Sequence, residues 1–172
     1  MPSGLAENVK VNNSILTLST SGPATAGEIC STMLFGHNEY LARMKLGTTP
    51  KGLCAFFLFE GGDYSDEIDI EFYTDNPSVI QFVVWKDDGQ VDIVQKGLGF
   101  DASSDFHIYG FTWAATKIDF VVDGNTIHTF NDVYNMPTDD MYLLFYCANP
   151  SYFGSYVGPT SLEVDYVEVR SA

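Results

Sequence analysis

The chain has 172 residues, enough for one well-buried core and too few for two ordinary domains, so we expect a single domain over residues 1–172. Hydrophobic residues make up 45% of it and aromatic residues 15%, which excludes a disordered chain, and no apolar run approaches the roughly 20 residues of a membrane-spanning helix. With 8 basic and 23 acidic residues, the net charge of −15 would repel phosphate backbones, anionic lipids and other copies of the chain, so we expect a monomer with neither nucleic acid nor a membrane as partner.

Two features bear on the cellular compartment. Residues 1–7 have neither the basic region nor the apolar stretch of a secretory signal, so either the protein stays inside the cell or a signal has been removed. Of these two alternatives we expect a secreted protein. Cys30, Cys54 and Cys147 cannot all pair within the chain and lack the spacing of a metal site, and we expect them to be small buried hydrophobic residues.

Short stretches rich in Val, Ile, Phe, Tyr and Thr recur about every ten residues from Val9 onward, separated by clusters of Gly, Pro, Asn and Asp. Residues 67–72 alternate strictly between acidic and apolar side chains, the pattern of a half-buried strand. Asp123-Gly124 predicts a hairpin turn, and residues 162–167 alternate again, with Leu162, Val164 and Tyr166 on one face. No long segment shows a helical stripe. The sequence therefore predicts an all-β domain, either a sandwich or a barrel.

The segment from Glu67 to Glu71 is the most informative stretch, because a period of two places Glu67, Asp69 and Glu71 on one strand face. Ile68 and Ile70 then point into a core. Glycosidic bond cleavage needs such carboxyls, one to attack or stabilise the anomeric carbon and another to protonate the leaving oxygen. Because neighbouring negative charge disfavours ionisation, we expect a raised pKa for Asp69, which would hold or share a proton while the outer two residues take different roles.

An exposed acidic strand surface, or a divalent-cation site with hard oxygen ligands, would give the same pattern. A resemblance favours catalysis. Residues 67–72 resemble the active-site signature of glycoside hydrolase family 16, and four further segments resemble successive parts of its bacterial lichenases in the same order: 97–113, 121–124, 154–156 and 164–167. The resemblance runs from about Val11 to the C-terminus and implies a concanavalin-like jelly roll, a β-sandwich of two curved antiparallel sheets.

Carried over by position, the resemblance implies that Glu67 is the nucleophile, Glu71 the general acid/base and Asp69 the residue that orients and tunes them. The implied reaction is retaining endo-hydrolysis of a neutral β-1,3-1,4- or β-1,3-glucan, with no cofactor for catalysis. The single residue between Asp69 and Glu71 resembles lichenases and transglycosylases more than most laminarinases. A transglycosylase of the same family and a catalytically weak glycan-binding module are the alternatives.

The resemblance also implies substrate contacts outside the acidic strand. Glu28 matches a sugar-binding acidic residue, and Trp85 lies close to a cleft tyrosine, where its ring could stack on a sugar. His107 follows a histidine and is expected to hydrogen-bond within the catalytic face. The segment that supplies stacking aromatics in the family contains Tyr146, Tyr152 and Phe153. Ordinary structural roles remain alternatives, such as a surface glutamate, a core aromatic residue or a structural histidine.

The chain departs from the lichenase pattern at several positions. Ser65 replaces a Trp, Cys30 an Arg and Val83 an Asn, so we expect hydrolysis without strict lichenase specificity. Ala26 stands where lichenases carry a disulfide cysteine, so we expect no disulfide. Asp165 matches the side-chain ligand of a structural Ca²⁺ on the family's convex face, and the alternative is an exposed strand Asp.

Overall fold

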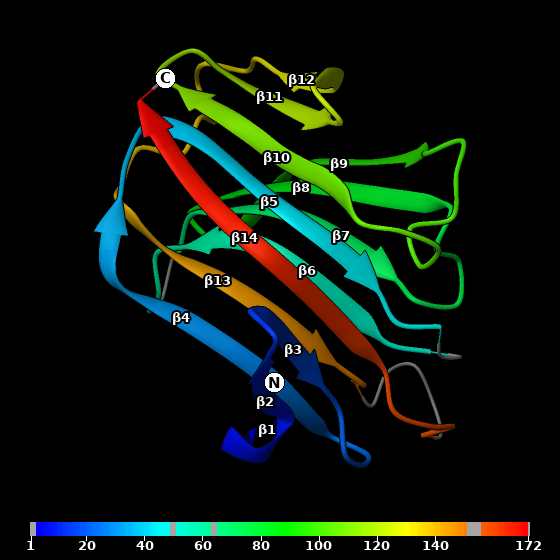
Figure 1. Ribbon diagram of the computed structural model, residues 1–172. Coiled ribbons are helices and arrows are strands. Elements are labelled where there is room, and N and C mark those ends of the chain that lie inside the picture. The colour runs from blue at the N-terminus through cyan, green and yellow to red at the C-terminus, as the bar shows by residue number, and fades with distance from the viewer. Residues whose placement is uncertain (1–2, 49–50, 63–64, 151–155, 172) are drawn as a thin grey trace.

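The computed structural model describes residues 3–48, 51–62, 65–150 and 156–171. Within these ranges the regular structure is almost entirely β, with one short 3-10 helix at Ala6–Asn8. No helix in the described part of the chain is long and apolar enough to cross a membrane. The strands form two seven-stranded sheets that stack face to face (Figure 1), so the predicted β-sandwich is confirmed.

Each sheet combines strands from distant parts of the chain. In spatial order, the first sheet contains β1 (Ser3–Gly4), β4 (Thr25–Phe35), β13 (Met141–Ala148), β6 (Leu53–Phe59), β7 (Glu67–Tyr73), β8 (Val79–Lys86) and β9 (Gly89–Gly97). The second sheet contains β12 (Asn125–Phe130), β11 (Lys117–Val122), β10 (His107–Ala114), β5 (Asn38–Leu46), β14 (Ser161–Ser171), β3 (Ile15–Ser19) and β2 (Val9–Asn12). Among the described residues, all paired strands are antiparallel except β1 with β4.

Aromatic side chains fill the space between the sheets. Phe56 of β6 packs against Phe111 of β10 with ring centroids 5.8 Å apart, and Phe82 of β8 stacks on Phe120 of β11 at 4.6 Å. All four are fully buried. Pairs of this kind contribute about 1 kcal/mol each beyond the burial of their area. They fix the first sheet on a rigid support, so its outer face can carry a site.

The predicted hairpin is confirmed, whereas the last strand differs from its prediction. Asp123 and Gly124 join β11 to β12 with φ of 48° and 76°, the left-handed pair that a tight two-residue turn requires. In β14, Leu162 and Val164 face the core, but the register shifts between Val164 and Tyr166. This bulge turns Tyr166 outward, where it is 40% exposed, so the alternation expected beyond Val164 is wrong.

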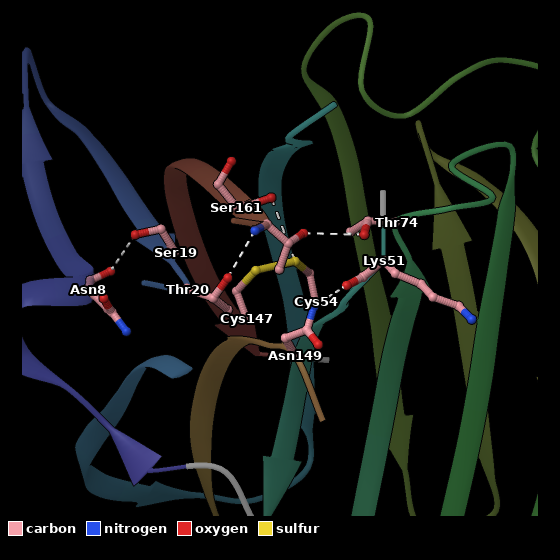
Figure 2. Close-up of a disulfide and its surroundings, with 10 residues drawn as sticks. Asn8, Ser19, Thr20, Lys51, Cys54, Thr74, Cys147, Asn149 and Ser161 are labelled. Carbon is pink, nitrogen blue, oxygen red and sulfur yellow. Dashed lines mark hydrogen bonds between the residues drawn. A yellow bond between two sulfur atoms is a disulfide. The ribbon is translucent and has the colours of Figure 1, made fainter. Parts of the chain in front are cut away.

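A disulfide joins two neighbouring strands in the middle of the first sheet. Figure 2 shows the bond between Cys54 of β6 and Cys147 of β13, which are direct cross-strand partners. Both residues are fully buried. The expectation of buried cysteines is confirmed for this pair, while the expectation of no disulfide is wrong. Their sequence separation of 93 residues hides a pairing that only the strand register reveals. Cys30, in contrast, is free and exposed on β4, so its predicted burial is also wrong.

Candidate active site

A cleft of about 530 Å³ lies on the outer face of the first sheet. Glu67, Asp69 and Glu71 of β7 line it together, as the alternation of this strand predicts. The residues between them, Ile68 and Ile70, are fully buried in the core on the opposite face. The walls of the cleft are largely apolar, and its larger side chains are Phe57, Phe59, Trp85, Leu144 and Tyr146.

The cross-strand register gives Asp69 and Glu71 different surroundings. We call the residues that lie opposite one another across successive strands a row. The row of Asp69 contains Cys30 and four apolar residues: Leu144, Phe57, Val83 and Ile93. The row of Glu71 carries polar groups on both sides: Glu28, Tyr146, Gln81 and Gln95, with Ala55 between Tyr146 and Glu71. An apolar row penalises a charged carboxylate and a polar row tolerates one, so the two acids cannot titrate alike.

Asp66 fixes the start of β7. Its side chain is fully buried and accepts hydrogen bonds from Lys86 Nζ at 3.0 Å and from the backbone N–H groups of Asp87 at 3.2 Å and Thr138 at 2.9 Å. These contacts tie β7 to the end of β8 and to the loop that precedes β13. The three carboxyls therefore project from a strand whose first residues are held in register with the neighbouring strand.

Asp69 is the most perturbed acid of the site. It is 3% exposed, and burial raises its pKa well above the ordinary value, with the charges of Glu67 and Glu71 adding to the effect. A hydrogen bond with Trp85 acts in the opposite direction and is outweighed. The sequence predicted the raised pKa from charge crowding, but burial is the larger cause. Asp69 and Glu67 share a hydrogen bond, which raises the pKa of Asp69 and lowers that of Glu67.

The two outer glutamates have different hydrogen-bond partners. Burial raises the pKa of Glu67 to about 7, although the hydrogen bond with Asp69 opposes this rise. Burial also raises the pKa of Glu71, and a hydrogen bond from Gln81 opposes it. Because the three carboxyls interact, their protons belong to the group as a whole. A site with distinct donors on its two glutamates can give them distinct roles.

The structure brings some of the other predicted contact residues to the cleft. Glu28 of β4, Trp85 of β8 and Tyr146 of β13 all line it. Their roles toward a sugar stay predictions. Tyr152 and Phe153 lie outside the described residues.

His107 does not lie in the cleft. It belongs to β10 of the second sheet, where its Nδ1 lies 2.7 Å from Asp123 Oδ2 and its ring stacks on Phe100 at 3.8 Å. The expectation that it hydrogen-bonds within the catalytic face is therefore corrected. Strand β10 pairs with β5 and β11, and neither strand belongs to the sheet of β7.

Asp165, the expected Ca²⁺ ligand, has a protein partner. Arg43 Nη1 of β5 donates to its Oδ2 at 2.6 Å, across the bulge of β14. A guanidinium in this position neutralises the carboxylate that would attract the ion. The described residues also contain no group of three or more His, Cys, Asp or Glu that could hold a metal ion. Asp165 thus has a charged protein partner, and the Ca²⁺ ion stays an untested prediction.

Sequence reasoning missed most of the cleft floor and the partner of Glu71. Phe57, Phe59 and Leu144 line the cleft, yet β6 and β13 are apolar on both faces, so alternation cannot tell their inner side from their outer side. Gln81 was not singled out, although it is 6% exposed and bonded to Glu71. A glutamine in a segment that is otherwise apolar from Val79 to Trp85 was the available signal.

Comparison with known proteins identifies the family of the chain. The family model described as glycosyl hydrolases family 16 matches residues 3–153. A beta-glucanase of Acetivibrio thermocellus is 34% identical over 157 residues, which cover 87% of this chain and 46% of that protein. A beta-glucanase of Paenibacillus polymyxa is 34% identical over 179 residues, covering 96% of this chain and 74% of that protein. The chain thus spans about half the length of the first of these relatives.

Solved structures of similar proteins have the same fold as this chain. A beta-glucanase from Bacillus licheniformis superimposes with a TM-score of 0.87 at 27% identity, covering 97% of this chain and 83% of that one. A prokaryotic beta-1,3-1,4-glucanase (lichenase) derived from a mouse hindgut metagenome superimposes with a TM-score of 0.86 at 28% identity, covering 96% and 84%. The jelly-roll topology is shared throughout the described chain.

Proposed function

This chain belongs to glycosyl hydrolase family 16, and from that premise we propose that it is a retaining endo-β-glucanase that acts on a neutral β-1,3-1,4- or β-1,3-glucan. The observation that carries the proposal is the buried Asp69 between two glutamates that receive different hydrogen bonds in one cleft. Relatives named beta-glucanase and lichenase support the choice of substrate.

The proposed reaction proceeds in two displacements on the anomeric carbon. Glu67 attacks and forms a glycosyl-enzyme, while Glu71 gives its proton to the leaving glycosidic oxygen. Glu71 then takes a proton from water, and that water releases the sugar with its original anomeric configuration. Asp69 supplies a hydrogen bond to Glu67 from a largely neutral carboxyl, so it directs the nucleophile without adding a third full charge to the cleft.

The lining of the cleft supports a neutral sugar chain. Phe59, Trp85 and Tyr146 offer aromatic faces on which sugar rings stack. The acidic side chains of β7 and the net charge of −15 oppose a sulfated polysaccharide. Val83 and Cys30 lie in the row of Asp69, where they offer little hydrogen bonding, which supports a specificity looser than that of a strict lichenase.

A secreted location is part of the proposal. Disulfides persist in oxidising compartments and are rare in reducing ones. The buried Cys54–Cys147 bond therefore supports a protein that works outside the cytoplasm, where polysaccharides are encountered.

Reducing-end release from lichenan, laminarin, xyloglucan, agarose and carrageenan tests this function. We expect release from lichenan or laminarin, with the β-anomer formed first when the products are followed by proton NMR. Longer products in the presence of oligosaccharide acceptors would indicate a transglycosylase instead. Binding of a glucan without release would indicate a binding module, and release from a sulfated galactan alone would contradict the substrate class.

The perturbed carboxyls also predict how stability depends on pH. The pKa of Glu67 rises from 4.5 to about 7 on folding, so between these values the folded protein holds a proton that the unfolded chain has lost. Its contribution to stability is full below pH 4.5 and falls as the pH rises through about 7. Glu67→Gln should therefore stabilise the fold more above pH 7 than below pH 4.5 in urea unfolding. Glu7→Gln, at an exposed glutamate, should show no such difference, and an equal effect of Glu67→Gln at both pH values would contradict the prediction.

A further inference from the structure

Two glutamine side chains connect Glu71 to the edge of the first sheet. Gln81 of β8 lies directly opposite Glu71, and its Nε2 donates to Glu71 Oε2 at 2.5 Å. Gln95 of the edge strand β9 lies directly opposite Gln81, and its Nε2 donates to Gln81 Oε1 at 2.9 Å. Gln81 is buried, whereas Gln95 is exposed. The three side chains thus form a line of hydrogen bonds that runs in one direction, from β9 to the cleft.

We infer that Gln81 and Gln95 are positioning residues for Glu71: Gln95 fixes the orientation of the Gln81 amide, so that Glu71 always faces an N–H donor and never a carbonyl acceptor. An amide can present either of its ends, and the two ends have opposite effects on a carboxyl. The Gln95 donor occupies the carbonyl oxygen of Gln81 and thereby leaves its NH₂ group for Glu71. This inference rests on the proposed role of Glu71 as general acid/base.

The polarity of this line matters to an acid that must give its proton to a substrate. A carbonyl beside Glu71 would accept the carboxyl proton and hold it away from the glycosidic oxygen. The NH₂ group of Gln81 cannot accept it, so the proton of Glu71 stays available to the cleft. The same donor also favours the ionised form of Glu71, which opposes the rise in its pKa on burial and helps it act as a base in the second displacement.

Other titratable groups lie around Glu71, so the variants that test the inference should leave them unchanged. On its own strand these are Glu67, Asp69 and Tyr73, whose hydroxyl lies 3.4 Å from Gln81 Nε2. On the β6 side its direct partner is Ala55, beyond which lie Tyr146 of β13 and Glu28 of β4. None of these groups is itself substituted in the variants below. Gln81→Leu also removes the contact between Gln81 and the Tyr73 hydroxyl, so the Gln95 variants, which keep Gln81, report on the glutamine line alone.

Three substitutions separate the parts of the inference. Gln81→Leu removes the donor and should lower kcat roughly 10- to 100-fold, with the basic limb of the pH profile moving to higher pH because Glu71 holds its proton more firmly. Gln95→Leu should have a smaller effect in the same direction. Gln95→Glu presents an acceptor to Gln81, which turns the amide around, so it should lower kcat more than Gln95→Leu while KM stays unchanged. Gln90→Glu adds the same charge to β9 beside Trp85 and should leave kcat and the profile as in the parent.

Titration of Glu71 by ¹³C NMR reports on the inference without requiring turnover. Its carboxyl resonance, assigned by its loss in Glu71→Gln, should titrate at higher pH in Gln81→Leu and in Gln95→Glu, and at the parent value in Gln90→Glu. Because Gln95 is exposed, its variants should fold even if Gln81→Leu does not. An unchanged Glu71 titration in Gln95→Glu would overturn the inference and leave the proposed function standing. A shifted Glu71 titration in a protein that releases no sugar from any glucan would contradict the proposed function and support the inference about the two glutamines.

Discussion

Glu67→Gln is expected to lower kcat on the preferred glucan on the order of 10⁴-fold or more, because the amide cannot attack the anomeric carbon. The remaining glutamate that interacts with Asp69 is Glu71, which has the proposed role of acid/base. The substitution keeps the shape of the side chain and removes only a charge that burial already disfavours. Loss of activity should therefore occur in a protein that is as stable as the parent, or more so at alkaline pH. Initial rates of reducing-end release, together with urea unfolding of the same samples, measure both effects.

The companion variant Glu71→Ala separates the two glutamates. Without an acid/base, hydrolysis should fall by about 10²- to 10⁴-fold, with smaller losses on substrates whose leaving group needs no proton. Added azide should restore turnover, because a small anion needs no base to attack the glycosyl-enzyme, and the product should be the β-glycosyl azide. An α-glycosyl azide would mean that Glu71, and not Glu67, is the nucleophile. Glu7→Gln serves as the control for a glutamate outside the cleft.

The acidic face of β7 was predictable because its two faces differ in chemistry. Ile68, Ile70 and Phe72 pack into the core while the acids between them line the cleft, so alternation alone fixes which side chains share a surface. The turn at Asp123-Gly124 was predictable for a similar local reason, since both residues tolerate the positive φ that the turn needs. In both places the physical constraint acts within a few residues of the chain.

The rest of the cleft depends on strand register, which a single sequence does not encode locally. Strand β6 is apolar on both faces, so its alternation could not distinguish Phe57, which lines the cleft, from Phe56, which lies in the core. The placement of His107 in the second sheet also follows from strand order, since β10 pairs with β5 and not with β7. The bond between Gln81 and Glu71 likewise arises only where β8 is aligned on β7.

The disulfide is the feature on which stability should depend most. Cys54 and Cys147 are 93 residues apart, so reduction frees a loop of more than half the chain and adds about 4–5 kcal/mol of conformational entropy to the unfolded state. Because both residues are fully buried, reduction without substitution tests this bond while leaving the core packing in place. Equilibrium urea unfolding in oxidising and in reducing buffer should differ by that free energy, with a lower midpoint when the bond is open. Cys30→Ser removes the free thiol and should preserve the difference, since Cys30 lies exposed on β4. Equal unfolding free energies in the two buffers would show that the strands hold their register without the bond, and the support that it lends to a secreted location would then be lost.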